Sequence, residues 1–197
     1  MTPYERRNLL ITSIGAMFAF AVLVVYYFQL GAMQQALKDS QKALQLEKRA
    51  WVGPTEATAG EFVAGKIFRT AVRIRNNGGS PAIDVEVAYM LQNVPKGGLP
   101  NFPNIWERTA HEPRGKSVLQ PTDGIMVAPS TENDGPLNTD TVDAILHGDY
   151  ISYIFGEVAY TDIFGDRHWT KWCYFYAPIR QTFSLCPFYN EVDKQKE

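Results

Sequence analysis

The apolar segment at residues 9–30 limits the possible folds of this chain more than any other feature. It reads LLITSIGAMFAFAVLVVYYFQL, and no charged residue occurs between Arg7 and Lys38. A helix needs about 20 such residues to cross the hydrocarbon core of a bilayer. A helix packed on a soluble core would instead show polar residues at every third or fourth position. We therefore predict a helix at residues 9–30 that lies in the lipid bilayer.

The ends of this segment favour an uncleaved signal anchor over a cleaved signal peptide. A signal peptide has an apolar run of roughly 7 to 15 residues, and the run here is longer. Leu30, Gly31 and Ala32 form only a fair cleavage site. Tyr26 and Tyr27 lie near the exit end, where aromatic rings favour the membrane interface.

Basic residues on the two sides of the predicted span favour opposite orientations. Arg6 and Arg7 adjoin the span in the short segment 1–8 and favour a cytoplasmic N-terminus. Four basic residues stand farther away on the other side and count against it: Lys38, Lys42, Lys48 and Arg49. We give more weight to the adjacent pair and expect the part after the span to be exported.

Residues 31–50 predict a helical stalk that continues the span into water. The segment, GAMQQALKDSQKALQLEKRA, is rich in helix formers. Three pairs of residues recur seven apart: Leu37 with Leu44, Ala36 with Ala43, and Met33 with Ser40. This thin stripe permits two interpretations, a short parallel coiled coil that forms a weak homodimer or a solvated stalk with one side resting on the domain. Gly15 and Ala19 in the span form a small-xxx-small pair, a further weak indication of dimerisation.

From Trp51 onward the sequence predicts β-strands. IFRTAVRIR alternates between apolar residues such as Val72 and basic residues such as Arg73, and AIDVEVAYM alternates between residues such as Ile83 and Val85 and the acid Glu86. Strands are expected near six segments: 51–57, 67–75, 82–91, 116–128, 150–161 and 167–177. This count without a βαβ rhythm predicts an immunoglobulin-like antiparallel β-sandwich at 51–190, followed by a C-terminal tail at 191–197.

The segments between these strands have patterns of their own. NNGGSP at 76–81 predicts a turn, and the opposite charges of the strands beside it could pair if those strands are neighbours. Residues 92–123 carry many prolines and predict a long irregular segment. NTDTVDAILHGD predicts a short helix capped by Asn138 or Thr139 and stopped by Gly148.

The chain offers little material for catalysis or metal binding. It contains three histidines: His111, His147 and His168. His168 and Cys173 lie five residues apart on a predicted strand and would point to opposite faces, so a zinc or copper site is not expected. The motifs GxSxG, GxxxxGK and GxGxxG do not occur, and Asp162 and Asp166 are explained as turn residues. We expect no catalytic residue, no metal and no cofactor. The net charge of −2 gives no reason to expect nucleic acid.

Cys173 and Cys186 predict one disulfide if the domain is exported, because the exported space is oxidising. Closing a loop of this size would stabilise the fold by roughly 3 kcal/mol. In a reducing cytoplasm the same residues would be two buried thiols.

The segment HWTKWCYFY at 168–176 carries aromatic residues on both faces of one predicted strand, although the outer face of a sandwich should be polar. The candidate interaction patch contains four residues: Trp169, Trp172, Tyr174 and Tyr176. One interpretation is an exposed surface that binds a protein, a glycan or a lipid headgroup. The other is that the C-terminal tail or residues 92–123 fold over the outer face.

Three segments resemble a family of uncharacterised bacterial membrane proteins: NNGGSPAIDVEV, GEVAYTDIFGDRHWTKWCYFY and SLCPFYNEVD. The resemblance covers nearly the whole chain. It implies one N-terminal span, a short helix ending in a segment like RAWVG, and one all-β domain, but no activity. We expect a single-pass protein of the bacterial inner membrane with a periplasmic domain.

The expected role is that of a scaffolding or interaction protein, an accessory subunit of a membrane or envelope assembly with a protein partner. The alternative is a module that binds a glycan or small ligand through the aromatic strand.

Overall fold

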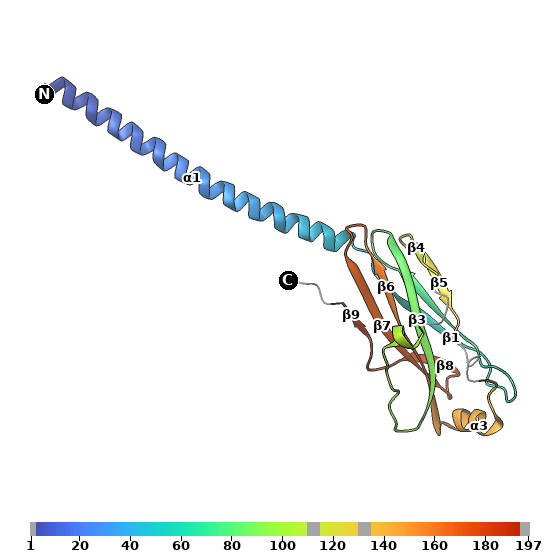
Figure 1. The fold of residues 1–197 in the computed structure, drawn as a ribbon. Coiled ribbons are helices and arrows are strands. Elements are labelled where there is room, and N and C mark those ends of the chain that lie inside the picture. The colour runs from blue at the N-terminus through green and yellow to red at the C-terminus, as the bar shows by residue number, and fades with distance from the viewer. Residues whose placement is uncertain (1–2, 110–114, 130–134, 194–197) are drawn as a thin grey trace. The chain divides into compact units, whose positions relative to one another are not determined.

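The computed structural model describes residues 3–109, 115–129 and 135–193, and the chain divides into two units, Met1–Glu47 and Lys48–Glu197 (Figure 1). The helix α1 (Pro3–Lys48) has 46 residues and runs without a break across the predicted boundary between span and stalk. The prediction that the stalk reaches residue 50 is wrong, because Arg49 and Ala50 lie buried in the second unit.

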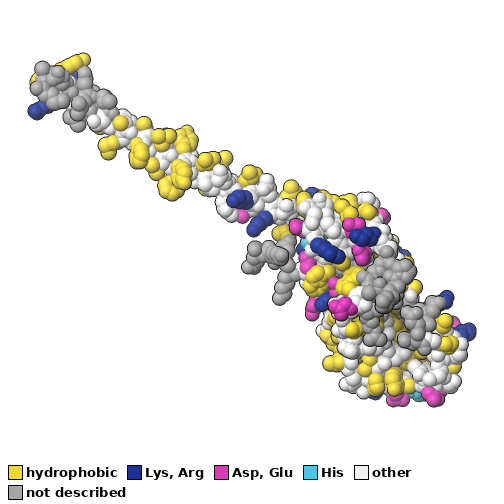
Figure 2. Space-filling view, viewed as in Figure 1, with side chains coloured by type: hydrophobic (Ala, Val, Ile, Leu, Met, Phe, Trp, Pro, Cys, Tyr) yellow, Lys and Arg dark blue, Asp and Glu magenta, His cyan; other side chains and the backbone are white. Residues whose placement is uncertain are grey.

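By length and composition α1 could cross a membrane. The candidate span is Ser13–Lys48, with a mean hydropathy of 1.9 in its apolar window. Hydrophobic side chains gather on the part of α1 that precedes its lysines (Figure 2). The four predicted membrane-flanking residues all lie on α1 and are exposed: Arg6, Arg7, Tyr26 and Tyr27.

The second unit contains two antiparallel sheets, so the chain after α1 is mainly β, as predicted. The smaller sheet has the order β1 (Val52–Ala59), β2 (Thr70–Asn76), β5 (Gly124–Val127). The larger sheet has the order β4 (Ser117–Leu119), β3 (Ala82–Pro95), β6 (Tyr150–Thr161), β7 (Arg167–Ala177), β8 (Thr182–Leu185). A short strand, β9 (Glu191–Val192), also pairs with β7.

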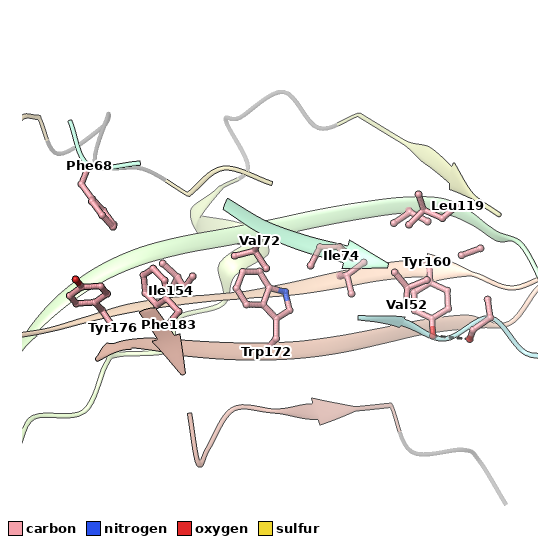
Figure 3. Packing of buried hydrophobic residues seen from close by; sticks show 14 of the residues in the cluster. Val52, Phe68, Val72, Ile74, Leu119, Ile154, Tyr160, Trp172, Tyr176 and Phe183 are labelled. Atoms are coloured by element: carbon pink, nitrogen blue, oxygen red, sulfur yellow. Dashed lines mark hydrogen bonds between the residues drawn. The ribbon is translucent and has the colours of Figure 1, made fainter. Parts of the chain in front are cut away.

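The two sheets face each other across one hydrophobic core (Figure 3). The smaller sheet contributes Val52, Val72 and Ile74, each at most 2% exposed. The larger sheet contributes aliphatic and aromatic side chains: Ile154, Val158, Tyr160, Trp172, Tyr176 and Phe183. Burial of these apolar side chains is the main favourable contribution to folding. The dry face predicted for residues 67–75 is confirmed.

The turn at 76–81 carries the chain from one sheet to the other, so β2 and β3 do not pair. Their charged faces meet other partners. Arg73 lies opposite Glu56 of β1, and Lys116 Nζ lies 3.8 Å from Asp84 and 3.5 Å from Glu86.

The prediction that Ile83 shares the dry face of β3 is also wrong. Asp84 has a φ of 51° at a register shift in β3, and Ile83 is 37% exposed. The bulge breaks the two-residue alternation from which the prediction was made.

Other boundaries differ from the prediction because they depend on contacts between distant segments. The strand expected at 116–128 is two strands, β4 and β5, in different sheets. The segment expected to be irregular from residue 92 begins as the last part of β3 and contains α2 (Ile105–Arg108). The helix α3 (Thr139–His147) is confirmed, with Asn138 Oδ1 accepting from the N–H of Thr141 at 2.7 Å. The tail expected at 191–197 is part of the domain through residue 193.

Candidate functional site

The structure places the predicted aromatic patch largely inside the domain. Trp172 and Tyr176 point from β7 into the core and are 0% and 5% exposed, and half-buried Tyr174 packs on the same core (Figure 3). The prediction of an exposed patch is therefore wrong for Trp172 and Tyr176. Alternation along β7 puts these residues on one face, and that face is turned toward the smaller sheet.

The opposite face of β7 is covered by two other parts of the chain. Cys173 packs with Phe155, Ile105 and Cys186 in a second hydrophobic cluster. Above it, the rings of Phe102 and Tyr189 stack with centroids 4.1 Å apart. Residues from 92–123 thus cover this face, as the structural interpretation predicted, together with residues 186–189, which precede the predicted tail.

Lys171 lies beside the aromatic rings that cover this face of β7. Lys171 Nζ lies 4.9 Å from the ring centroid of half-buried Trp169 and 5.6 Å from that of Tyr189. Burial, together with the nearby carboxylates of Glu157 and Glu191, raises the pKa of Tyr189 to about 12. The phenol therefore stays neutral at physiological pH.

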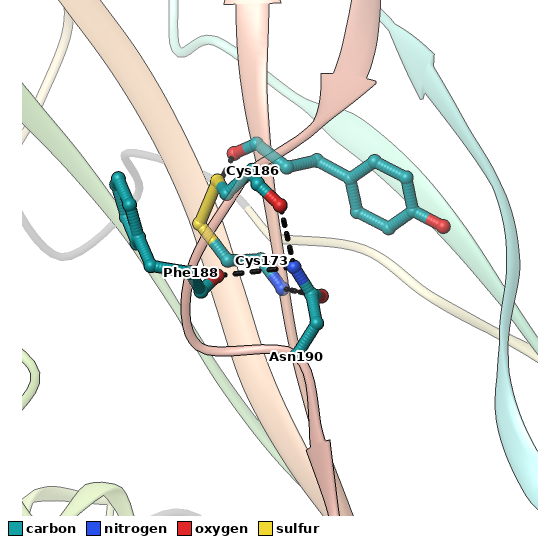
Figure 4. The surroundings of a disulfide bond; sticks show 5 residues. Cys173, Cys186, Phe188 and Asn190 are labelled. Atoms are coloured by element: carbon teal, nitrogen blue, oxygen red, sulfur yellow. Dashed lines mark hydrogen bonds between the residues drawn. A yellow bond between two sulfur atoms is a disulfide. The ribbon is translucent and has the colours of Figure 1, made fainter.

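The C-terminal segment closes the free edge of β7 (Figure 4). β8 pairs with one part of this edge and β9 with another. Between them, Cys173 N–H donates to Asn190 Oδ1 at 3.1 Å and Cys173 O accepts from the N–H of Cys186 at 3.0 Å. Asn190 Nδ2 also donates to the carbonyls of Cys186 and Phe188. An edge closed in this way cannot pair with the strand of another chain.

Cys173 and Cys186 lie at disulfide distance in the middle of this closed edge, with Sγ atoms 2.04 Å apart. Both residues are buried, at 0% and 3% exposed. The bond would hold the C-terminal segment on β7, as the sequence predicts.

The least expected feature is a series of four ionisable side chains, each at hydrogen-bond distance from the next, that begins at Arg49. Arg49 Nη2 lies 2.6 Å from Asp193 Oδ1, and Asp193 Oδ2 lies 2.8 Å from His168 Nδ1. His168 Nε2 lies 2.9 Å from Asp162 Oδ2. The side chains of Arg49, Asp162 and His168 are 3%, 3% and 9% exposed. This charged cluster therefore joins three parts of the chain: the segment after α1, the two ends of the β6–β7 turn, and the C-terminal segment.

His168 lies between two carboxyl groups of the cluster. Each of its ring nitrogens lies at hydrogen-bond distance from one of them. Buried polar groups need partners of this kind, because burial without a hydrogen bond is costly.

Asp162 is held in its ionised form. Burial by itself raises the pKa of this carboxyl, but hydrogen bonds from His168 and from the N–H groups of Asp166 and Phe164 outweigh burial. The pKa of Asp162 therefore lies below its usual range. The N–H groups of Phe164 and Asp166 lie 2.9 and 3.0 Å from Asp162 Oδ1, so the same side chain fixes the β6–β7 turn.

This pKa shift predicts the pH dependence of stability. Because Asp162 has a lower pKa in the folded protein than in the unfolded chain, where Asp titrates near 3.9, it stabilises the fold above about pH 3.9. That contribution is lost as the pH falls through the folded-state pKa. We expect the free energy of unfolding of the full chain in detergent, from urea titrations, to fall less steeply with acid in Asp162→Asn than in wild type. Asp166→Asn, at an exposed position of the same turn, should keep the wild-type slope. Equal slopes for wild type and Asp162→Asn would contradict the assignment.

Main-chain bonds fix the entry segment, residues 49–51, beside the charged cluster. The N–H groups of Asn77 and Gly79 donate to the carbonyls of Trp51 and Arg49 at 2.7 and 3.2 Å. Buried Asn76 accepts from the N–H of Trp51 and donates to the carbonyl of Leu119. The backbone of Gly78 packs closely against the entry segment, because a Cβ at this position would lie 2.3 Å from the carbonyl oxygen of Arg49. The turn NNGGSP therefore holds the segment that directly follows α1.

Two of the three histidines lie among the described residues. Nε2 of His168 lies at hydrogen-bond distance from Asp162 and Nδ1 from Asp193. Within residues 3–109, 115–129 and 135–193 no group of three His, Cys, Asp or Glu side chains is placed to hold a metal. His147 lies on α3 and bonds the carbonyl of Asp143, and His111 lies outside the described residues.

Comparisons of the chain with protein-family models, curated proteins and solved structures found no match.

Proposed function

We propose that this chain is a membrane-anchored scaffolding or interaction protein, an accessory subunit of a membrane or envelope assembly without catalytic activity. The observation that carries the proposal is the fixed entry segment. Residues 49–51 follow the apolar helix directly, and the turn at 76–81 and the charged cluster hold them in the domain. A folded domain that begins directly after an anchor helix suits the positioning of a partner at the membrane.

The strand order supports an immunoglobulin-like fold for the domain. In chain order, the first, second and fifth strands form one sheet and the third, sixth and seventh lie together in the other, as in immunoglobulin constant domains. The fourth strand differs, because β4 lies beside β3 instead of in the smaller sheet. Domains of this architecture often serve recognition at cell surfaces.

We further propose that the protein crosses the bacterial inner membrane once, through residues 9–30, with the domain in the periplasm. Arg6 and Arg7 beside the span support a cytoplasmic N-terminus. The pairing of Cys173 and Cys186 supports an oxidising compartment for the domain.

Labelling of single exposed cysteines tests the orientation. The native cysteines are too buried to report it, so one variant carries Ile179→Cys, at a position 100% exposed, and the other Tyr4→Cys, at a position 66% exposed. In spheroplasts, a membrane-impermeant maleimide should label the cysteine at 179 and should reach the cysteine at 4 only after lysis. The reverse pattern, or no labelling at 179 before lysis, would overturn the periplasmic placement.

The scaffolding role has a separate test. Native gel electrophoresis of gently solubilised membranes should show the chain in an assembly larger than its own homodimer. Migration only as monomer or homodimer would count against an accessory subunit.

A further inference from the structure

The unbroken course of α1 gives its apolar and polar parts one common helical register. Within that register, leucines recur at every seventh residue: Leu23, Leu30, Leu37 and Leu44. Residues spaced by seven lie on one face of a helix, and such a face is what two supercoiled helices bury between them. We call this stripe and its immediate neighbours the leucine face.

Between positions 31 and 46 the polar part of α1 keeps its charges off the leucine face, but at its end Glu47 falls at d and Lys48 at e. If the leucines occupy position a of a heptad, the charged residues between positions 31 and 46 fall at b, c and f: Lys38, Asp39 and Lys42. The flanking e and g positions carry uncharged residues: Gln34, Gln41, Ala36 and Ala43. Up to residue 46, two identical helices could therefore meet on this face without like charges opposing one another, whereas the Glu47 side chains would face each other at the last d position.

In the first part of the apolar segment the same face carries small residues, whereas nearer the stalk it carries Leu23, Tyr26 and Leu30. Gly15, Ala16 and Ala19 fall at g, a and d of the same heptads. In lipid, helices associate through small residues that let the backbones approach closely, whereas in water they associate through buried leucines. The same face of α1 therefore carries small residues where the span begins and leucines in the stalk.

The large side chains of this face are exposed in the single chain. Met33, Leu37 and Leu44 are 70%, 61% and 53% exposed, although they lie in the polar part of the helix. Removing them from water would stabilise an association of helices.

We propose that the partner of the leucine face is α1 of a second copy, in a parallel dimer that extends from the span into the stalk. The inference rests on the proposed anchoring, because insertion in one orientation makes two copies parallel and sets them at the same depth. Parallel, in-register alignment is what a heptad stripe needs. Confinement to one membrane also raises the effective concentration of the second copy. Ser40 at a d position keeps the dimer weaker than one with leucine there.

Disulfide cross-linking tests the face. Single cysteines are introduced at each position from 36 to 45 of the full chain, with the native pair retained, and membranes are oxidised with copper phenanthroline. The yield of covalent dimer should peak at positions 37, 40 and 44 and be at least about fivefold lower at 38, 42 and 45, which point away from a parallel two-stranded interface. The chain without an added cysteine gives the background. Equal yields at all positions, a peak on the opposite face, or no dimer at any position would overturn the proposal.

A matched pair of double variants gives a second readout. Leu37→Glu with Leu44→Glu places two acids on the leucine face, and Gln35→Glu with Gln45→Glu places the same charge off it. Light scattering of the purified full chain in detergent measures the association constant of the dimer. This constant should be at least about tenfold lower in the first pair than in wild type. The second pair should keep the wild-type dimer fraction, and Ser40→Leu should raise it. A monomeric wild type, or equal loss in both pairs, would overturn the dimer, whereas the maleimide labelling of positions 4 and 179 tests the anchoring alone.

Discussion

Gly156→Ala should destabilise the domain by about 3 kcal/mol, far more than a substitution at an exposed position usually does. Gly156 lies on β6 opposite Trp172 of β7, and the indole occupies the space that a side chain at 156 would need. A Cβ there would lie 2.5 Å from the carbonyl oxygen of Ala88 and 2.5 Å from an indole carbon of Trp172. The carbonyl belongs to the neighbouring strand β3 and cannot move without disturbing the sheet, so the strain cannot relax.

Urea denaturation of the full chain in detergent, followed by near-ultraviolet circular dichroism, measures this effect. The matched control is Gly53→Ala, also in a strand, where a Cβ would meet only Thr170 Cγ2 at an ordinary 3.5 Å. That variant should unfold within about 0.5 kcal/mol of wild type. If Gly156→Ala unfolded like Gly53→Ala, the close packing of Trp172 on β6 would be wrong.

Local patterns in the sequence predicted the elements whose causes are local. The alternation of 67–75 predicted the buried face of β2, and the ends of α3 were predicted at Asn138 or Thr139 and at Gly148, since caps and alternation depend on a few adjacent residues. The apolar run predicted a helix long enough for a membrane for the same reason. The patterns also predicted that the helix continues into the stalk, but they could not show that it ends at Lys48 and that Arg49 already belongs to the domain.

Features that depend on distant contacts were beyond the sequence. The aromatic strand had apolar side chains on both faces, so alternation alone could not show that Trp172 points inward and Cys173 lies under Phe102 and Tyr189. In the same way Gly156 carried no signal of its contact with Trp172.

The charged cluster was missed for a related reason. Asp162 was explained as a turn residue, which is half of its role, and His168 was considered only as a metal ligand. Arg49 and Asp193 are 144 residues apart. The one available signal was the six-residue spacing of Asp162 and His168 across a predicted hairpin turn, which brings the two side chains together at the end of the strands.

Loss of Asp193 should be among the most damaging changes of a polar residue in this domain. Asp193→Ala leaves Arg49, with a side chain 3% exposed, without its carboxylate, and removes one of the two acceptors of His168. Uncompensated buried charge typically costs about 3 to 5 kcal/mol, and we expect about 3 because the carboxylate itself is 14% exposed. The free energy of unfolding of the full chain in detergent, from urea titrations, measures the loss.

Glu191→Ala is the matched control, an acid two positions earlier in the same segment. Its side chain is 60% exposed and lies 3.9 Å from Lys171, so its removal should cost less than about 0.5 kcal/mol. If the damage in Asp193→Ala comes from the unpaired cation, Arg49→Met in the same chain should restore part of the stability, because buried ion pairs can be replaced by apolar side chains. Equal effects of Asp193→Ala and Glu191→Ala would contradict the cluster. Loss without recovery in the double variant would instead place the importance of Asp193 in its bond to His168, and so in the β6–β7 turn.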